Sequence, residues 1–240
     1  MKANKLAALI VTTYIGFISM AHASAPQPLF SPEQEARIGE IAADYLVSHP
    51  EILVTVSRKL QEQQETRKQK MSALSVMENQ ANLLHDPDTP AYGPDNAKVA
   101  VIEFFDYQCV FCSRFAPELE KVMKAQPDVR YLFKEWPIFG GRWEASLQAA
   151  QQGLTVWQKK GPQAYVTYHN AIYATGHNEG KLTAEDIHGA ASKAGLTTPA
   201  PGDHTASLEK NSNLAEELGL TGTPGIIVMP VSGATPDTIT

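Results

Sequence analysis

The stretch FFDYQCVFCSRFAPELEKV, residues 104–122, holds both cysteines of the 240-residue chain, with two residues between them. A disulfide stabilises a fold mainly by closing a long loop, so a bridge between such near neighbours contributes little. Redox chemistry and binding of a soft metal are the two remaining uses. Structural zinc needs four ligands, and the histidines of this chain are scattered without a close pair. Copper(I), which two thiolates can hold, stays open as an alternative to redox chemistry.

The flanks of the cysteine pair predict a strand, a short turn and a helix. Residues 98–107 form a continuous apolar and β-branched run, which is typical of a buried strand. After Cys112, apolar residues recur on one helical face, at Phe115, Leu119, Val122 and Met123. Cys109 should therefore lie exposed at a helix N-terminus, where amide groups and the helix dipole stabilise its thiolate and lower its pKa. Cys112 follows one turn later, close enough to attack a mixed disulfide at Cys109.

Three segments in the same order resemble the exported DsbA-like thiol:disulfide oxidoreductases of the thioredoxin superfamily. They are residues 104–122, FKEWPIFGG at 133–141, and LGLTGTPGIIV at 218–228. The resemblance runs from about Pro94 to Val228. It implies an α/β thioredoxin fold with a helical insertion at about 141–218.

The resemblance also implies roles for the residues that match. Cys109 is the expected nucleophile and Cys112 the buried resolving thiol. Pro224 matches the family's cis-proline, which holds the backbone of Thr223 against the cysteine pair, where it can bond to a substrate strand. Gly222 joins these residues as a predicted substrate contact.

Glu103 matches a buried acid of the family near the second cysteine, where a carboxyl could accept the proton that Cys112 loses. The alternative is that Glu103 caps a strand end or pairs with Lys134 on the neighbouring strand. Asp106 has no such match and is predicted to be a loop residue.

The dipeptide between the cysteines departs from the strong oxidants of the family, which carry a histidine there. Val110 and Phe111 offer neither charge nor hydrogen-bond donor, so we expect a less depressed Cys109 pKa and a weaker oxidant. Phe111 should present an exposed apolar surface to unfolded substrate; the alternative is packing in the core.

The segment after FKEWPIFGG predicts four helices, at residues 142–160, 161–173, 183–195 and 205–219. Gly219 is a suitable C-terminal cap for the last. After residue 228 the family continues with a strand and a helix. Here residues 229–240 supply at most a turn and a short strand, which would begin at Ile239.

Residues 1–23 have the features of a signal peptide: Lys2 and Lys5, an apolar run, and a small-x-small site ending at Ala23. A membrane anchor is the alternative, but the apolar run is short. Cleavage after Ala23 and a periplasmic location are therefore expected. The net charge of −6 is mildly acidic and provides no electrostatic footprint for nucleic acid.

Residues 24–84 are predicted to form a helical stalk and connector, with helix starts at Ser31 and Ser48 and with the second helix running to Leu84. Apolar residues recur every seven positions, but residues 62–70 contain none. A long polar helix cannot bury itself, so residues 31–60 should associate with other copies and residues 61–75 should connect. DsbA-like proteins similar to the suppressor of copper sensitivity protein C carry such a stalk and form trimers; the alternative is a stalk that folds back. Residues 85–97 would be the linker and 98–240 the DsbA-like domain.

Together these features predict a periplasmic enzyme that oxidises or isomerises disulfides in exported proteins and needs no cofactor beyond its cysteines. Its expected partners are unfolded or misoxidised exported proteins and a membrane redox protein of the DsbD or DsbB type. A copper(I)-binding protein and a non-redox holdase are the competing hypotheses.

Overall fold

A computed structural model of the chain describes residues 29–197 and 201–240. The chain divides into two compact units, Met1–Lys59 and Leu60–Thr240. The predicted signal peptide and its cleavage after Ala23 lie outside the described residues. Within those residues, no helix combines the length and the apolar character that crossing a membrane requires.

The first unit contains helix α1 (Pro32–Ser48) and the start of helix α2 (Glu51–Glu78). A capping box begins α1, in which Ser31 Oγ accepts from the Gln34 amide at 3.3 Å and Gln34 Oε1 accepts from the Ser31 amide at 2.8 Å. The helix start predicted at Ser31 is confirmed, whereas Ser48 is the last residue of α1 and the second helix begins at Glu51. No residue of α1 is buried, although the helix carries several large apolar side chains: Ile38, Ile41, Tyr45, Leu46 and Val47.

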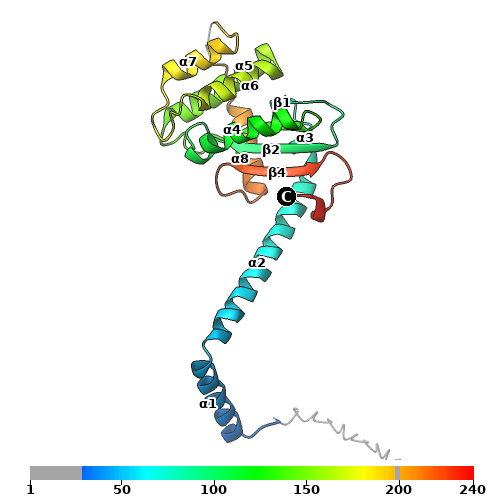
Figure 1. The fold of residues 1–240 in the computed structure, drawn as a ribbon, viewed down its shortest axis with the longest axis vertical. Coiled ribbons are helices and arrows are strands. Elements are labelled where there is room, and N and C mark those ends of the chain that lie inside the picture. The colour runs from blue at the N-terminus through cyan, green and yellow to red at the C-terminus, as the bar shows by residue number, and fades with distance from the viewer. Residues whose placement is uncertain (1–28, 198–200) are drawn as a thin grey trace, which may run out of the picture. The chain divides into compact units, whose positions relative to one another are not determined.

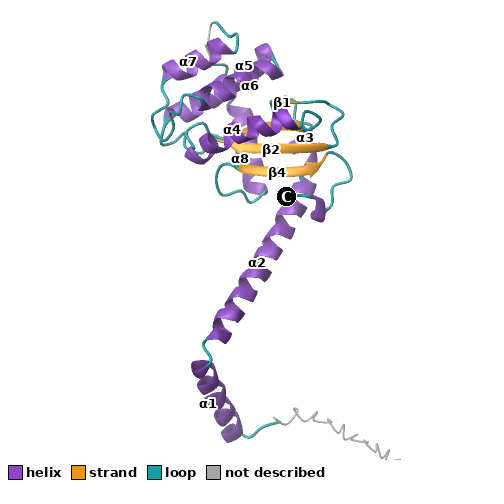
Figure 2. Cartoon of the chain, viewed as in Figure 1, coloured by secondary structure: helices purple, strands orange, loops and turns teal. Residues whose placement is uncertain are grey.

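The second unit is built on a four-stranded mixed sheet with the order β1-β3-β2-β4. Figure 2 shows the sheet in orange, with β1, β2 and β4 labelled. Its strands are β1 (Ala91–Tyr92), β2 (Val99–Phe105), β3 (Arg130–Glu135) and β4 (Gly225–Pro230). β2 and β3 are parallel, and β4 is antiparallel to β2. The crossover between β2 and β3 is helix α4 (Val110–Ala125), as in the predicted α/β thioredoxin fold.

The predicted helical insertion is present between β3 and β4 (Figure 1). It consists of α5 (Glu144–Lys160), α6 (Pro162–Tyr173), α7 (Ala184–Lys193) and α8 (Thr205–Glu217). Each begins and ends within two residues of its predicted range. Gly219, the predicted C-terminal cap, has a φ of +70°, which suits glycine because it lacks a Cβ.

The side chains of the central strands β2 and β3 point alternately into two cores, one on each face of the sheet. Glu103 pairs with Phe133 across β2 and β3, and Phe104 pairs with Lys134. Because side chains alternate along a strand, Glu103 and Lys134 point to opposite faces of the sheet. The face with Phe105 and Phe133 packs against α4 to α7, and we call it the thiol face. The opposite face, the anchor face, packs against α2, α3 (Gln80–Leu84) and α8.

The structure corrects the predicted linker at residues 85–97. Ala91 and Tyr92 form β1 and pair with β3, while Val76 and Leu83 are buried in the core of the anchor face. The second compact unit therefore begins at Leu60 rather than at residue 98. The single helix predicted to run to Leu84 is also interrupted, because α2 ends at Glu78 and α3 follows.

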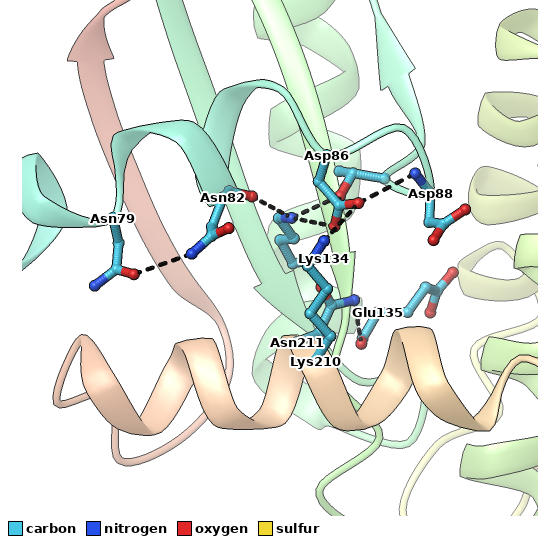
Figure 3. Close-up of polar contacts among 9 residues, drawn as sticks. Asn79, Asn82, Asp86, Asp88, Lys134, Glu135, Lys210 and Asn211 are labelled. Carbon is cyan, nitrogen blue, oxygen red and sulfur yellow. Dashed lines mark hydrogen bonds and ion pairs between the residues drawn. The ribbon is translucent and has the colours of Figure 1, made fainter.

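The buried Lys134 of β3 binds residues 82–89 to the sheet through hydrogen bonds and an ion pair (Figure 3). Lys134 Nζ donates to the Asn82 carbonyl at 2.9 Å and to Thr89 Oγ1 at 2.6 Å, and it pairs with Asp86 Oδ2 at 3.2 Å. Lys210 of α8 pairs with the other Asp86 oxygen at 3.0 Å. The alternative in which Glu103 pairs with Lys134 is therefore wrong, because the lysine lies on the other face with its own partners.

Beyond β4 the chain makes a short 3-10 helix, η1 (Pro236–Thr238), and then returns to the strand. Thr240 and Val228 exchange backbone hydrogen bonds of 3.0 and 2.7 Å. The short stretch of extended chain expected from Ile239 thus lies beside β4.

Candidate active site

Cys109 is the N-cap residue of α4, the position predicted from the strand, turn and helix pattern. Its backbone is extended, and it precedes the first amides of the helix, which have no partner within the helix. Apolar residues at helical spacing, Ala116, Leu119 and Met123, bury the same face of α4 as Cys112 and orient its first turn. Both cysteines are free thiols, so the structure represents the reduced dithiol.

Several hydrogen bonds converge on the Cys109 sulfur and lower its pKa from 9.0 to about 6. The largest contribution is the hydrogen bond from Cys112, and the amides of Cys112 and Phe111 add to it. The sulfur also lies 3.3 Å from the Thr223 carbonyl oxygen. With this pKa most Cys109 thiols are ionised at neutral pH, and the thiolate is the nucleophilic form.

Thr223 belongs to the loop before β4, and its bond to Pro224 is cis, as predicted. This loop lies against Cys109, which is only 4% exposed. The prediction that the Cys109 sulfur is exposed is therefore wrong for this state, because the helix N-terminus is covered by the Thr223 loop.

Cys112 is completely buried. Its hydrogen bond to Cys109 and its burial raise its pKa, so it remains a protonated thiol beside the Cys109 thiolate. The two sulfurs thus differ in protonation state, which suits one for attack and leaves the other in reserve.

Glu103 lies on the thiol face at 1% exposure, and neither of its carboxyl oxygens has a hydrogen-bond partner. Burial, followed by the charge of Cys109, raises its pKa from 4.5 to about 8. Its charge in turn contributes to the raised pKa of Cys112. The buried acid expected near the second cysteine is therefore in electrostatic reach of both thiols.

Phe111 is 62% exposed, so the alternative of core packing is excluded. The guanidinium carbon of Arg114 lies 5.8 Å from the centre of its ring, which places a positive charge one turn into α4. Val110 is half-buried, as is Gly222 in the Thr223 loop. Gly222 and Pro224 also line a groove of about 830 Å³ whose other wall is α2, including Met71 and Leu74.

Sequence reasoning missed the residues that hold the cysteine loop in place. Asp106 is a loop residue, as predicted, but it is buried and accepts hydrogen bonds from the Gln108 and Phe139 amides and from Ser146 Oγ. Gln108 Oε1 accepts from the Gly180 amide at 2.7 Å. These contacts connect the loop to segments 33 to 72 residues away, which no local pattern encodes.

His169 of α6 was also missed as a site residue. It is 1% exposed, and its Nε2 atom lies 4.0 Å from Glu103 Oε2. In the part of the chain that the structure describes, no group of three or more histidine, cysteine or acidic side chains is arranged to hold a metal ion.

Comparisons with known proteins identify the family of the chain. A family model described as "Thioredoxin" matches residues 85–235, and one described as "Copper resistance protein ScsC N-terminal domain" matches residues 34–67. The chain is 39% identical to BcfH of Salmonella enterica Typhimurium, with a TM-score of 0.72, covering 83% of this chain and 85% of that one. A linker-deleted Proteus mirabilis ScsC variant is 28% identical, with a TM-score of 0.61, covering 89% and 90% of the two chains.

A curated relative, Disulfide bond formation protein D of Bacillus subtilis, is 27% identical over 154 residues. That match covers 58% of this chain and 67% of the Bacillus protein. The chain spans 22% of a longer curated relative, an Na(+)/H(+) antiporter of Salinispora arenicola, at 25% identity. The match of the thioredoxin model over more than half of the chain, joined to the ScsC N-terminal match, shows that the chain belongs to the thioredoxin family as a DsbA-like protein of the ScsC type.

Proposed function

We propose that the chain is a periplasmic thiol:disulfide oxidoreductase that oxidises and isomerises disulfides in exported proteins. The observation that carries the proposal is the Cys109 sulfur. It has a lowered pKa at a helix N-terminus, lies 3.3 Å from the Thr223 carbonyl and is backed by a buried, protonated Cys112.

In the reducing direction, the Cys109 thiolate attacks a substrate disulfide, forms a mixed disulfide and releases one substrate thiolate. Cys112 then gives up its proton, attacks the Cys109 sulfur and releases the second substrate thiolate. Glu103 is the proposed acceptor of the Cys112 proton, because its pKa near 8 falls between those of an ordinary carboxyl and a thiol. Oxidation of a substrate is the reverse sequence, and isomerisation stops at the mixed disulfide while the released thiolate attacks elsewhere.

The proposed substrate surface surrounds this sulfur. The Thr223 backbone would pair with an extended segment of the client, since the loop already places its carbonyl against Cys109. Val110, Phe111 and Gly222 would contact the client beside it, and the exposed Phe111 ring favours unfolded chains with accessible apolar side chains.

The first unit supports a role in assembly. Its apolar side chains include Ile38, Ile41, Tyr45, Leu53 and Val56, each about half exposed. They repeat at three- and four-residue intervals along α1 and α2, which is the spacing of a helix seam. We therefore infer a homotrimer formed through residues 31–60. Clustered active sites would hold a misfolded client for repeated attack, which favours isomerisation. A membrane protein of the DsbD or DsbB type would reset the cysteine pair.

The chemical part is tested by mixing the reduced protein with a peptide disulfide. Cys109→Ser should abolish reaction, while Cys112→Ser should accumulate the mixed disulfide at Cys109, which mass spectrometry detects. If Cys109→Ser still exchanges disulfides, the proposed nucleophile is wrong. If it retains full protection of unfolded clients and the wild type shows no exchange, the holdase hypothesis replaces ours. Stoichiometric copper(I) binding without exchange would favour the copper hypothesis.

The assembly part is tested with scrambled ribonuclease. The full chain should restore its activity faster than a chain beginning at Leu60, which keeps the second compact unit intact. Leu53→Gln with Val56→Gln should lower the mass measured by light scattering, whereas Lys59→Gln with Glu62→Gln should not. Equal isomerase rates for trimeric and monomeric forms would refute the role of the stalk.

A further inference from the structure

Behind the cysteine pair lies a second pair of buried ionisable side chains, Glu103 of β2 and His169 of α6. Each is 1% exposed, and Nε2 of the histidine lies 4.0 Å from Oε2 of the acid. Neither that nitrogen nor either carboxyl oxygen has a hydrogen-bond partner among the described residues. Buried polar atoms are nearly always paired, so these atoms require a reason beyond packing.

The histidine is held in one orientation. Its Nδ1 atom lies 3.0 Å from Asn170 Oδ1, and in the tautomer that donates from Nδ1 to this oxygen, Nε2 has a free lone pair. Aromatic rings enclose it, with centres 5.0 Å away for Phe105, 5.1 Å for Phe133 and 4.9 Å for Tyr173. The lone pair that remains faces Glu103.

Burial disfavours the charged forms of both Glu103 and His169. Burial lowers the pKa of His169 from 6.5 to about 4, while burial and the Cys109 charge raise that of Glu103 to about 8. The pair is therefore neutral in the reduced protein at neutral pH, with an acid proton on Glu103 and an unprotonated Nε2 opposite it. Other ionisable groups interact with one or the other side chain from neighbouring elements: Glu120 and Cys112 of α4, Glu135 of β3, Tyr165 and Tyr173 of α6, and Cys109 of the cysteine loop.

We propose that His169 is a positioning residue for disulfide exchange, whose Nε2 accepts the hydrogen bond of the protonated Glu103 carboxyl. The proposal rests on the proposed function. In the mixed disulfide the Cys109 sulfur is uncharged, so one of the two causes that raise the Glu103 pKa is gone. When Cys112 attacks, its proton moves to an oxygen of the ionised Glu103 carboxylate, the Cys109–Cys112 bond forms, and the substrate thiolate leaves with the electron pair of the broken bond between it and Cys109. The new acid proton then points at Nε2, a contraction of about 1 Å turning the 4.0 Å approach into a hydrogen bond.

This role makes Glu103 a stronger base. A hydrogen bond to the protonated form favours that form, so it raises the affinity of the carboxylate for the Cys112 proton. An aromatic ring in place of His169 would fill the same space but provide no acceptor. The distinction between packing and positioning is therefore measurable.

The experiment follows resolution of a mixed disulfide between Cys109 and a short peptide thiol in the full chain, as a function of pH. In His169→Phe we expect the midpoint of the profile to move down by about half a pH unit or more and the plateau to fall roughly fivefold, the size of one hydrogen bond. In a Glu103→Gln background, His169→Phe should change the rate by less than about twofold, because the base is already gone. An unchanged midpoint, or an equal slowing in both backgrounds, would reduce His169 to a packing residue.

A second measurement uses only the wild type and Glu103→Gln, and so does not depend on folding of the His169 variant. The ¹⁵N resonance of His169 Nε2 should shift as Glu103 titrates and should lose that transition in Glu103→Gln. A resonance indifferent to Glu103 would overturn the proposal. Failure of the mixed disulfide to form at Cys109 would instead count against the proposed function itself.

Discussion

Neighbouring strands of one sheet carry two buried ionisable side chains that the fold treats in opposite ways. On the anchor face, Lys134 has three acceptors for its three protons, and Asp86 supplies a countercharge (Figure 3). On the thiol face, Glu103 has no hydrogen-bond partner at all. Removing the countercharge of a buried ammonium is costly, whereas burial without partners keeps an acid in its protonated form and makes its ionisation costly. The difference predicts which substitutions damage stability and which change proton affinity.

The largest effect is expected when the anchor face loses its countercharge. Asp86→Asn keeps the shape of the side chain but leaves the Lys134 ammonium buried with neutral acceptors only. Breaking a buried pair in this way costs about 3–5 kcal/mol of unfolding free energy. Asp95→Asn is the matched control, because Asp95 pairs with Arg130 at the surface with its side chain 93% exposed, and exposed pairs contribute about 1 kcal/mol or less. Urea unfolding measures the stability of both variants. Equal losses would contradict the expected difference between the buried and the exposed ion pair.

The thiol face should show the opposite behaviour when Glu103→Gln removes its ionisable carboxyl. The folded pKa of Glu103, about 8, is raised above its ordinary 4.5, so its stabilising contribution is complete below pH 4.5 and is lost as pH rises to 8. Relative to the reduced wild type, Glu103→Gln should therefore gain about 1.4 kcal/mol per pH unit across that window.

Glu118→Gln is the control for this pH dependence, because Glu118 lies at the surface beside Lys121. Its stability difference from wild type should stay nearly constant with pH. The measurement is the urea midpoint of the reduced proteins at several pH values. If the stability difference between Glu103→Gln and wild type does not change with pH, Glu103 is ionised across this window in the folded protein. Its pKa would then not be raised by burial.

A smaller loss is expected from Thr89→Val on the anchor face. Valine has nearly the same shape but removes the hydroxyl that accepts from Lys134 at 2.6 Å, leaving one proton of a buried cation without a partner. Hydrogen bonds to charged groups contribute about 1.5–3 kcal/mol, so thermal unfolding should reveal a loss of that size. Thr66→Val, on the exposed part of α2, should change stability by less than about 0.5 kcal/mol. A similar small change at Thr89 would imply that water replaces the lost acceptor.

The contrast between the faces depends on register, which is why sequence reasoning did not find it. The strand before Cys109, the helix after it and the four helices of the insertion follow from local apolar spacing, and the cis bond before Pro224 follows from the family resemblance. Lys134 looked like a partner for Glu103 because the two lie on neighbouring strands. The pairing of Phe104 with Lys134 turns them to opposite faces, and only the folded sheet reveals this.

Long-range contacts account for the other misses. His169 reaches Glu103 from a helix 66 residues later, and Asp86 reaches Lys134 from a segment whose proline and aspartate content suggested a linker. Burial of Cys109 results from the Thr223 loop, more than 100 residues away. Each of these contacts depends on packing between distant segments, which the spacing of apolar residues along the sequence does not indicate.

The smallest effect concerns a second buried acid on the thiol face, and it tests whether hydrogen-bond donors distinguish this acid from Glu103. Glu135 is as buried as Glu103, but its Oε1 accepts from Tyr165 at 2.7 Å and from Tyr107 at 3.0 Å. Tyr165→Phe keeps the ring and removes one donor, so it should lower the unfolding free energy by about 0.5–1.5 kcal/mol. Tyr45→Phe, at an exposed position in α1, should have no measurable effect on the second unit. If Tyr165→Phe also leaves the unfolding free energy unchanged, the hydrogen bond from Tyr165 to Glu135 does not contribute to stability. The absence of partners at Glu103 would then lose its special meaning, and only the pH dependence of Glu103→Gln could still assign that acid to the chemistry of the thiols.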